Sequence, residues 1–180
     1  MVVVTFSGLH GAGKSVYAKD IASEFDLRYV SAGELFRQIA RDRDLTITEL
    51  TDIAARDSLI DKEMDERTRR EVDKGSVVLD GQLTGWFAEK SADIKIFLKA
   101  RLDIRVARLA LRDGLSPEDA RKELHHREIA ERKRYKTLYG IDIGDLSIYE
   151  VILDTSFLGL ESTKKVLRTI IREYILAEKR

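Results

Sequence analysis

A glycine-rich segment near the amino end has the residue types and spacing of a phosphate-binding loop. The segment reads Gly8-Leu9-His10-Gly11-Ala12-Gly13-Lys14-Ser15, which fits G-x-x-x-x-G-K-[ST]. Its glycines let successive backbone N–H groups converge on one anion, and the helix expected to follow adds its positive amino-terminal end. Lys14 is expected to reach the β- and γ-phosphates of a nucleotide, and the Ser15 hydroxyl to bind Mg²⁺ directly. We therefore expect Gly8–Ser15 to hold a nucleoside triphosphate, with His10 acting as a spacer.

A second group of polar residues follows the next expected strand, 27–30. Ser31 and Gly33 lead into a helical segment on which Arg37 lies one turn in. Open α/β sheets bind ligands at the carboxyl edge of their strands, which is where this segment begins. We expect Arg37 to hold an anionic second substrate there, with Ser31 nearby.

A carboxylate ends the third expected strand, Val77–Asp80. An acid at this place can hold Mg²⁺ beside a phosphate-binding loop, usually through a water molecule. Asp80 is therefore the second expected magnesium residue, after Ser15. Gln82 follows two positions later and can hydrogen-bond a base or a phosphate, but it carries no charge.

Arginines recur at helical spacing in two later segments. On each segment, residues three or four positions apart share one helical face. The residues are Arg105, Arg108 and Arg112 on the first, and Arg127, Glu131 and Arg134 on the second. Phosphoryl transfer spreads charge over the equatorial oxygens, and one positioned arginine can contribute about 10³–10⁵ in rate by stabilising it. These two helices are therefore expected to bring cations to a transferring phosphate.

Short β-branched runs alternate with longer helical patterns, the rhythm of βαβ units around a parallel sheet. Strands are expected at 2–7, 27–30, 77–80, 94–98 and 149–153. Helices are expected at 14–25, 33–41, 59–74, 103–112, 116–138 and 160–177, with one more after the capping box Thr46-Ile47-Thr48-Glu49. Gly75, Gly114 and Gly140 stand where helices should end.

Composition is that of a globular protein. Of the 180 residues, 43% are hydrophobic and 36% charged, and Lys+Arg and Asp+Glu balance at 32 each, so no net field favours nucleic acid or a membrane as a partner. We expect a cytoplasmic protein, since there is no cysteine, no apolar run of membrane-spanning length and no signal-peptide pattern. The absence of Asn beside many Glu, Lys and Arg is typical of thermophiles. One monomeric domain, 1–180, is expected.

Two of these stretches resemble nucleoside monophosphate kinases, which share the P-loop. Ser31-Ala32-Gly33-Glu34-Leu35-Phe36-Arg37 resembles their S-T-G-D-x-L-R segment, whose arginine grips the acceptor's phosphate. Asp80-Gly81 resembles the D-G that follows the third strand in such kinases. Cytidylate and adenylate kinases usually carry an arginine at or shortly after this D-G, where the present chain has Gln82.

The later part of the chain resembles cytidylate kinases in particular. The pattern R-x-x-x-E-x-x-R over 127–134 is similar to their R-D-x-x-D-x-x-R, in which the outer arginines approach the transferred phosphate and the acid orients them. The stretches 139–142, 146–149 and 152–156 resemble the carboxyl-terminal third of archaeal-type cytidylate kinases. Such kinases pack the adenine beside the segment that corresponds to Asp154-Thr155-Ser156.

The resemblance implies a fold and a set of site residues. The fold is a three-layer P-loop NTPase domain whose five-stranded parallel sheet has the order 2-3-1-4-5, with acceptor-binding helices over about 33–75 and an arginine-rich lid over about 103–138. Arg108 joins the loop in binding ATP. The residues implied in catalysis are Lys14, Arg112, Arg127 and Arg134. The residues implied in acceptor binding are Ser31, Arg37, Asp80, Gln82, Arg127, Glu131 and Arg134.

The implied reaction is phosphoryl transfer from ATP, with Mg²⁺, to CMP or dCMP. A phosphate oxygen is already ionised at neutral pH, whereas a hydroxyl acceptor benefits from a base. Other acceptors such as AMP, dUMP or dephospho-coenzyme A stay open because Gln82 breaks the usual pattern. A hydroxyl-directed kinase with Glu34 or Asp80 as base, and a nucleotide-switched binding protein, also stay open, because a P-loop alone fixes no function.

Overall fold

The computed structural model describes residues 1–54, 56–88 and 90–178. The strands within them are β1 (Val3–Gly8), β2 (Arg28–Ser31), β3 (Val77–Asp80), β4 (Ile94–Lys99) and β5 (Val151–Asp154). They form one sheet in the order β2-β3-β1-β4-β5, and each neighbouring pair is parallel. The expected fold class and strand order are therefore confirmed.

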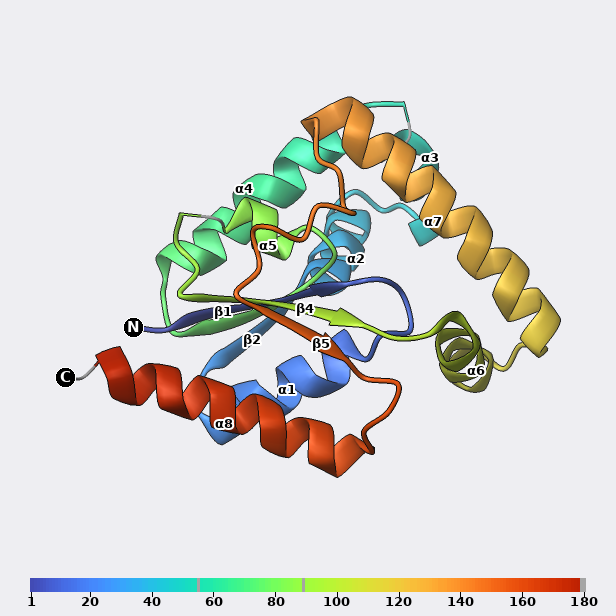
Figure 1. The fold of residues 1–180 in the computed structure, drawn as a ribbon. Helices are drawn as coiled ribbons and strands as arrows, with labels where there is room; N and C mark the ends of the chain where they lie inside the picture. Colours follow the sequence, from blue (N-terminus) through green and yellow to red (C-terminus); the bar gives the residue numbers. More distant parts are fainter. Residues whose placement is uncertain (55, 89, 179–180) are drawn as a thin grey trace.

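Helices cover both faces of this sheet. They are α1 (Lys14–Glu24), α2 (Ala32–Asp42), α3 (Ile47–Ala54), α4 (Leu59–Asp73), α5 (Thr84–Phe87), α6 (Leu102–Asp113), α7 (Pro117–Tyr139) and α8 (Leu160–Glu178). Figure 1 shows α1 and α8 along one face and α4 and α5 over the other, with α6 and α7 as a hairpin beyond the carboxyl end of β4. The ranges expected for the acceptor-binding helices and for the single domain, 33–75 and 1–180, include positions outside the described residues.

The core lies on both sides of β1. Val4 and Phe6 pack on one face against Ile21 of α1 and Leu167 of α8, and all four side chains are fully buried. Val3 points to the other face, into the cluster that contains residues of α4 and β3. A strand covered on both faces reads as a continuous apolar run, which is why the first strand could be expected from sequence.

Two local expectations differ from the structure. The last strand was expected from 149 but begins at Val151, because the backbone N–H of Tyr149 closes a turn by donating to Leu146 O at 3.2 Å. The ring of Tyr149 packs against Phe97 with the centroids 5.1 Å apart. The short helix α5 was not expected, since four residues, one of them Gly85, are too few to display a period. The lack of a side chain at Gly85 leaves room for the ring of Tyr149, because a Cβ there would lie 2.6 Å from that ring.

The expected helix ends are formed by the expected residues. Ser116 accepts a backbone N–H of α7 at 3.1 Å, and Gly114 and Gly140 cap α6 and α7 with φ of 68°. The capping box before α3 closes in both directions, since Thr46 N donates to Glu49 Oε2 at 2.8 Å and Glu49 N to Thr46 Oγ1 at 3.2 Å. These signals are local, so the sequence alone suffices to predict them.

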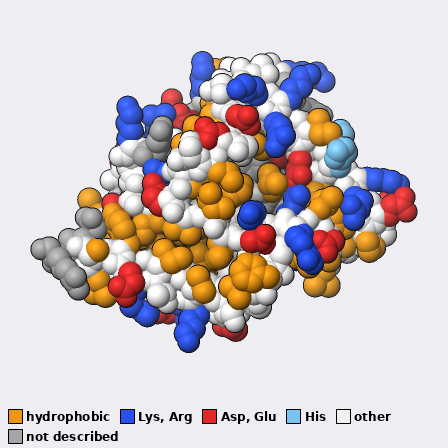
Figure 2. All heavy atoms as spheres, viewed as in Figure 1, with side chains coloured by type: hydrophobic (Ala, Val, Ile, Leu, Met, Phe, Trp, Pro, Cys, Tyr) orange, Lys and Arg blue, Asp and Glu red, His pale blue; other side chains and the backbone are white. Residues whose placement is uncertain are grey.

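Charged side chains of both signs are interspersed over the face shown in Figure 2. Some form networks: Glu63 accepts from Arg43 and Arg67, and Arg67 also donates to Asp42 at 2.7 Å. Such networks are a device of heat-stable proteins. In the part of the chain that the structure describes, no helix is both long and apolar enough to cross a membrane.

Truncation of the α8 contact with the core tests this packing. Leu167→Ala is expected to lower the free energy of unfolding by about 2–5 kcal/mol, because Leu167 is fully buried. Leu176→Ala on the same helix serves as the control and should change it by less than about 0.5 kcal/mol, because Leu176 is half exposed. Denaturant titration measures both values, and equal losses would contradict the observed orientation of α8.

Candidate active site

The phosphate-binding loop joins β1 to α1 through backbone conformations that favour glycine. Gly8, Gly11 and Gly13 have φ of 139°, 77° and 94°. A Cβ on Gly8 would lie 2.1 Å from the carbonyl oxygen of Leu98, and one on Gly11 would lie 2.8 Å from that of Arg105. These glycines are therefore required both by the turn and by the close approach of β4 and α6.

Four successive carbonyl groups of this loop each accept a hydrogen bond from a side chain. The bonds run from Lys14 to Leu9 O (3.0 Å), from Arg105 to His10 O (3.3 Å), from Arg108 to Gly11 O (3.1 Å) and from Thr155 to Ala12 O (3.0 Å). In a trans peptide the N–H points opposite to the C=O, so fixing the direction of a carbonyl also fixes the direction of the amide in the same peptide plane. Converging amides form an anion-binding concavity.

Lys14 lies in the midst of other charged groups. Burial lowers its pKa, the carboxylates of Asp80 and Glu131 act in the opposite direction, and the cations Arg105 and Arg112 add to the lowering. A phosphate bound at the loop would bring further negative charge to this ammonium group. The local electrostatics therefore suit an anionic ligand.

Asp80 receives hydrogen bonds from two elements. Ser15 Oγ donates to Asp80 Oδ2 at 2.5 Å, and the Tyr29 hydroxyl donates to the same oxygen at 2.8 Å. Burial, together with the Asp80 charge, raises the pKa of Tyr29 to about 12, so this hydroxyl stays a donor. A hydroxyl touching a carboxylate is an oxygen-only donor set, which fits Mg²⁺. Among the described residues no group of three or more His, Cys, Asp or Glu side chains could hold a metal ion.

Ser31 and Arg37 are brought together at the start of α2, as the sequence predicted. A Cβ on Gly33 would lie 3.6 Å from Ser31 Oγ and 3.7 Å from Arg37 Nη1, so both polar groups border the same point. The Arg37 guanidinium is half exposed and donates to Glu34 at 2.7 Å, and Arg41 donates to the other oxygen of that carboxylate. The Arg37 side chain is thus held in place by Glu34.

Two arginines of α6 turn toward the phosphate loop. Arg105 is 7% exposed and, besides its bond to the loop, donates to the Glu128 carboxylate on α7. Arg108 donates to both oxygens of Thr155, at 3.0 Å to Oγ1 and 2.9 Å to the carbonyl. The structure therefore gives Arg108 protein partners at the loop, and its direct contact with ATP stays a prediction.

The expectation that His10 is a mere spacer is wrong. His10 Nε2 lies 2.7 Å from Glu131 Oε2 on α7, and Gln82 Nε2 lies 2.7 Å from His10 Nε2 and donates to the same Glu131 oxygen at 2.8 Å. Burial alone would raise the pKa of Glu131, but the bonds from His10 and Gln82, with the charge of Arg127, hold it below 4.5. Glu131 was expected to orient arginines, but its hydrogen bonds are to His10 and Gln82. A largely buried carboxylate needs such donors close by.

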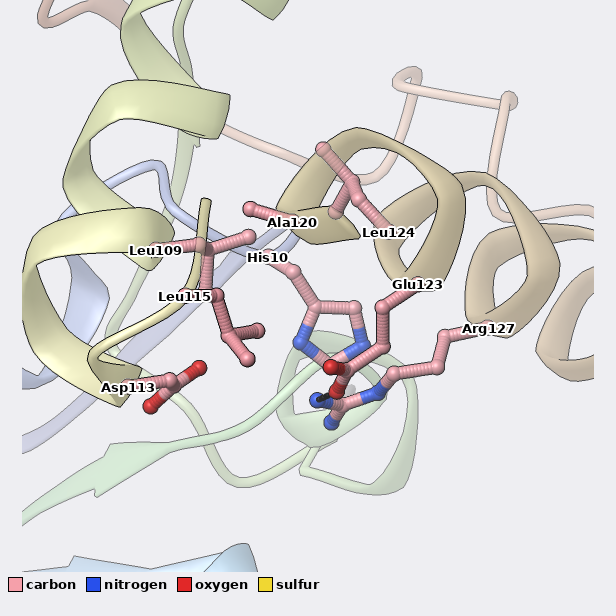
Figure 3. A pocket seen from close by; sticks show the side chains of 8 residues that line it. All are labelled: His10, Leu109, Asp113, Leu115, Ala120, Glu123, Leu124 and Arg127. Carbon is pink, nitrogen blue, oxygen red and sulfur yellow. Dashed lines mark hydrogen bonds and ion pairs between the residues drawn. The ribbon is translucent and has the colours of Figure 1, made fainter. Parts of the chain in front are cut away.

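The three remaining arginines of the expected lid each lie beside an acid. The distances are 2.7 Å from Arg112 to Asp113, 3.4 Å from Arg127 to Glu123 and 4.0 Å from Arg134 to Asp61. The Arg127–Glu123 pair flanks His10 at a small hollow between α6 and α7 (Figure 3). The charge of Arg112 lowers the pKa of Lys14, so it acts on the loop. That any of the three contacts a transferring phosphate stays a prediction.

Sequence reasoning missed Tyr29 and Asp61. Tyr29 stands two residues before Ser31 on β2, so its side chain shares the face of Ser31, and that spacing could have revealed it. Asp61 is 8% exposed, its Oδ2 has no hydrogen-bond partner among the described residues, and burial raises its pKa. No signal marked Asp61, which is one acid among many in the charged helix α4.

Thr155→Val tests the anchoring of the loop carbonyls. The substitution keeps the side-chain shape but removes the donor to Ala12 O in a fully buried place, so the free energy of unfolding should fall by about 1–3 kcal/mol. ATP affinity, measured by calorimetry, should fall with it. The control Thr169→Val removes an exposed hydroxyl of α8, and a loss as large there would contradict a specific role for Thr155.

Known proteins of similar sequence exist over nearly the whole chain. The chain matches the cytidylate kinase-like family over residues 3–157. It is 46% identical over 175 residues to a cytidylate kinase of Staphylothermus marinus, covering 97% of this chain and 99% of that protein. It is 41% identical over 170 residues to a cytidylate kinase of Pyrococcus horikoshii, covering 94% and 88%. Both relatives come from thermophilic archaea, in keeping with the composition of the chain.

Solved structures share the fold at lower identity. A shikimate kinase from Bacteroides thetaiotaomicron has a TM-score of 0.67 and 16% identity, covering 95% of this chain and 98% of that one. A protein from Eubacterium ventriosum has a TM-score of 0.74 and 15% identity, covering 96% and 99%. With the full-length relatives and the phosphate-binding loop beside Asp80, these findings lead to one conclusion: the chain belongs to the cytidylate kinase-like family.

Proposed function

We propose that this protein transfers the γ-phosphoryl group of ATP to the phosphate of CMP or dCMP, giving ADP and CDP or dCDP. One observation carries the proposal: polar contacts run along the carboxyl edge of the sheet from the phosphate loop to the start of α2. Ser15 donates to Asp80, Tyr29 donates to the same carboxylate, and Ser31 follows Tyr29 on β2. Donor and acceptor phosphates can thus be held on either side of Asp80.

On the donor side, the backbone amides of the loop and the start of α1 would hold the triphosphate, with Lys14 beside the transferring group. When bound with ATP, Mg²⁺ would neutralise phosphate charge. Ser15 would hold the ion directly, and Asp80 would do so through water. Every group in this set belongs to one chain, so we expect the monomer to be active.

On the acceptor side, the available acids make poor bases, which favours an acceptor that is already ionised. Hydrogen bonds from Arg37 and Arg41 lower the pKa of Glu34. Asp80 already accepts from Ser15 and Tyr29. A hydroxyl acceptor would need a base to take its proton, whereas a nucleotide phosphate needs none. Arg37 with Ser31 would grip that phosphate, and Gln82 and Glu131 would lie beside it.

The α6–α7 hairpin would close over both phosphates. Arg112, Arg127 and Arg134 would leave their acidic neighbours and stabilise the charge that spreads over the transferring group. Closure also excludes water and so limits hydrolysis of ATP.

An ADP-release assay with ATP, Mg²⁺ and a panel of acceptors tests the proposal. CMP and dCMP are expected to give the highest kcat/KM among CMP, dCMP, UMP, dUMP, AMP, dephospho-coenzyme A and shikimate. Another leading acceptor would replace CMP in the proposal. ATP turnover that no acceptor stimulates would instead indicate a nucleotide-switched binding protein.

Arg37→Ala tests the acceptor site. Loss of the guanidinium should lower kcat/KM for CMP by about 10²-fold or more, because truncating one partner of a charge pair costs about 2–5 kcal/mol. The dissociation constant for ATP, measured by calorimetry, should stay nearly unchanged. Arg41→Ala is the matched control, since Arg41 bonds the same Glu34 from the next turn of α2. Equal effects of the two substitutions would refute a specific role for Arg37.

Asp80→Asn tests the metal site. The amide keeps the size of the side chain but loses the charge, so the Mg²⁺ concentration that gives half-maximal activity should rise about 10–100-fold. Titration of activity with Mg²⁺ measures the shift. Asp142→Asn, in the exposed loop after α7, is the control, and an unshifted Asp80→Asn curve would remove Asp80 from the metal site.

A further inference from the structure

Three side chains from different parts of the fold meet at one point. His10 comes from the phosphate loop, Gln82 from the segment after β3, and Glu131 from the lid helix α7. His10 Nε2, Gln82 Nε2 and Glu131 Oε2 lie 2.7–2.8 Å from one another. The donor site, the acceptor side and the lid are therefore tied together by a single carboxylate oxygen.

The side chains that meet here are largely shielded from solvent. The side chains of His10 and Glu131 are only 16% and 21% exposed. A largely buried carboxylate that loses its donors is left with a desolvation cost, so Glu131 favours a position of α7 in which both donors are in reach. Its lowered pKa keeps it ionised at neutral pH. With the hydrogen on Nε2, His10 donates to Glu131 as Gln82 does, and that nitrogen then accepts nothing from Gln82.

A second contact holds the same loop residue from the other helix of the hairpin. Arg105 of α6 donates to the backbone carbonyl of His10 at 3.3 Å and also to Glu128 of α7. Glu128 lies one turn before Glu131, so both helices of the hairpin meet His10. The side chain and the backbone of His10 are thus both bound by the lid.

We propose that His10 and Gln82 are positioning residues that dock Glu131, and with it the lid helix α7, onto the phosphate loop. Docking sets the place of Arg127, which lies one turn before Glu131 and whose charge acts on that carboxylate. Gln82 donates to the same carboxylate from the segment after β3, which lies on the proposed acceptor side. The position of α7 therefore depends on the phosphate loop and on this segment together. This inference rests on the proposed function for its catalytic consequence but not for the docking itself.

His10→Leu is the principal test, with ATP, Mg²⁺ and CMP as substrates. The variant keeps an apolar side chain of similar size but cannot donate to Glu131. We expect kcat to fall about 10–100-fold, while KM for ATP changes less than about threefold, because a misplaced lid affects the transition state more than binding. The share of ATP hydrolysed rather than transferred to CMP should rise.

A conservative variant separates docking from packing. In His10→Gln the amide nitrogen stands about as far from Cβ as Nε2 does, so it can still donate to Glu131. We expect this variant to keep kcat within about threefold of the wild type. If His10→Gln is as slow as His10→Leu while both remain folded, the proposal is overturned. Gln82→Leu removes the second donor outside the loop and should repeat the loss of kcat.

Hydrogen exchange of the α7 amides tests docking without any turnover. His10→Leu and Gln82→Leu should speed deuterium uptake over Pro117–Tyr139, since α7 loses an anchor. His126→Leu is the matched control, because His126 lies exposed on the same helix and should leave uptake unchanged. Wild-type uptake and wild-type kcat in His10→Leu would overturn the proposal. If the two variants take up deuterium faster but the wild type does not phosphorylate CMP, the docking role of His10 and Gln82 stands and the proposed acceptor is refuted.

Discussion

The set of hydrogen bonds that fixes the carbonyl groups of the phosphate loop is the constraint on which the rest of the site depends. A glycine-rich loop is free to turn its amides in many directions, and its freedom would weaken any anion site. Side chains from α1, α6 and the end of β5 remove that freedom by donating to the carbonyl groups of Leu9, His10, Gly11 and Ala12. Side chains bonded to the loop carbonyls therefore preorganise the site before substrate binds.

Two carboxylates organise the remaining polar groups. Asp80 joins the loop to β2 through Ser15 and Tyr29, and Glu131 joins the loop to the lid through His10 and Gln82. Both acids also act on Lys14, where they offset the effect of burial and of neighbouring arginines on its pKa. Asp80 and Glu131 thus balance part of the positive charge around Lys14. Each of the two carboxylates accepts hydrogen bonds from donors on two separate segments of the chain.

What the sequence could predict was local or belonged to a well-defined motif. The loop, the strand order implied by its family and the caps at Gly114 and Ser116 depend on short stretches of residues, and all are found in the structure. The partner of His10 could not be predicted in this way, because Glu131 lies 121 residues later and meets it only after the hairpin folds back. The same holds for Arg105, whose helical face was visible in the sequence although its burial against the loop was not.

The fixed root of α6 limits how the hairpin can move. Arg105 and Arg108 bind the loop, and Gly11 packs so closely on Arg105 that the two backbones cannot slide past one another. In the proposed closure of the hairpin, the amino-terminal part of α6 would stay with the loop, and most of the movement would fall on α7 beyond Gly114. Because α6 is bonded to the loop proposed to hold ATP, the bound nucleotide and the base of the hairpin would keep a fixed relation to one another throughout such a closure.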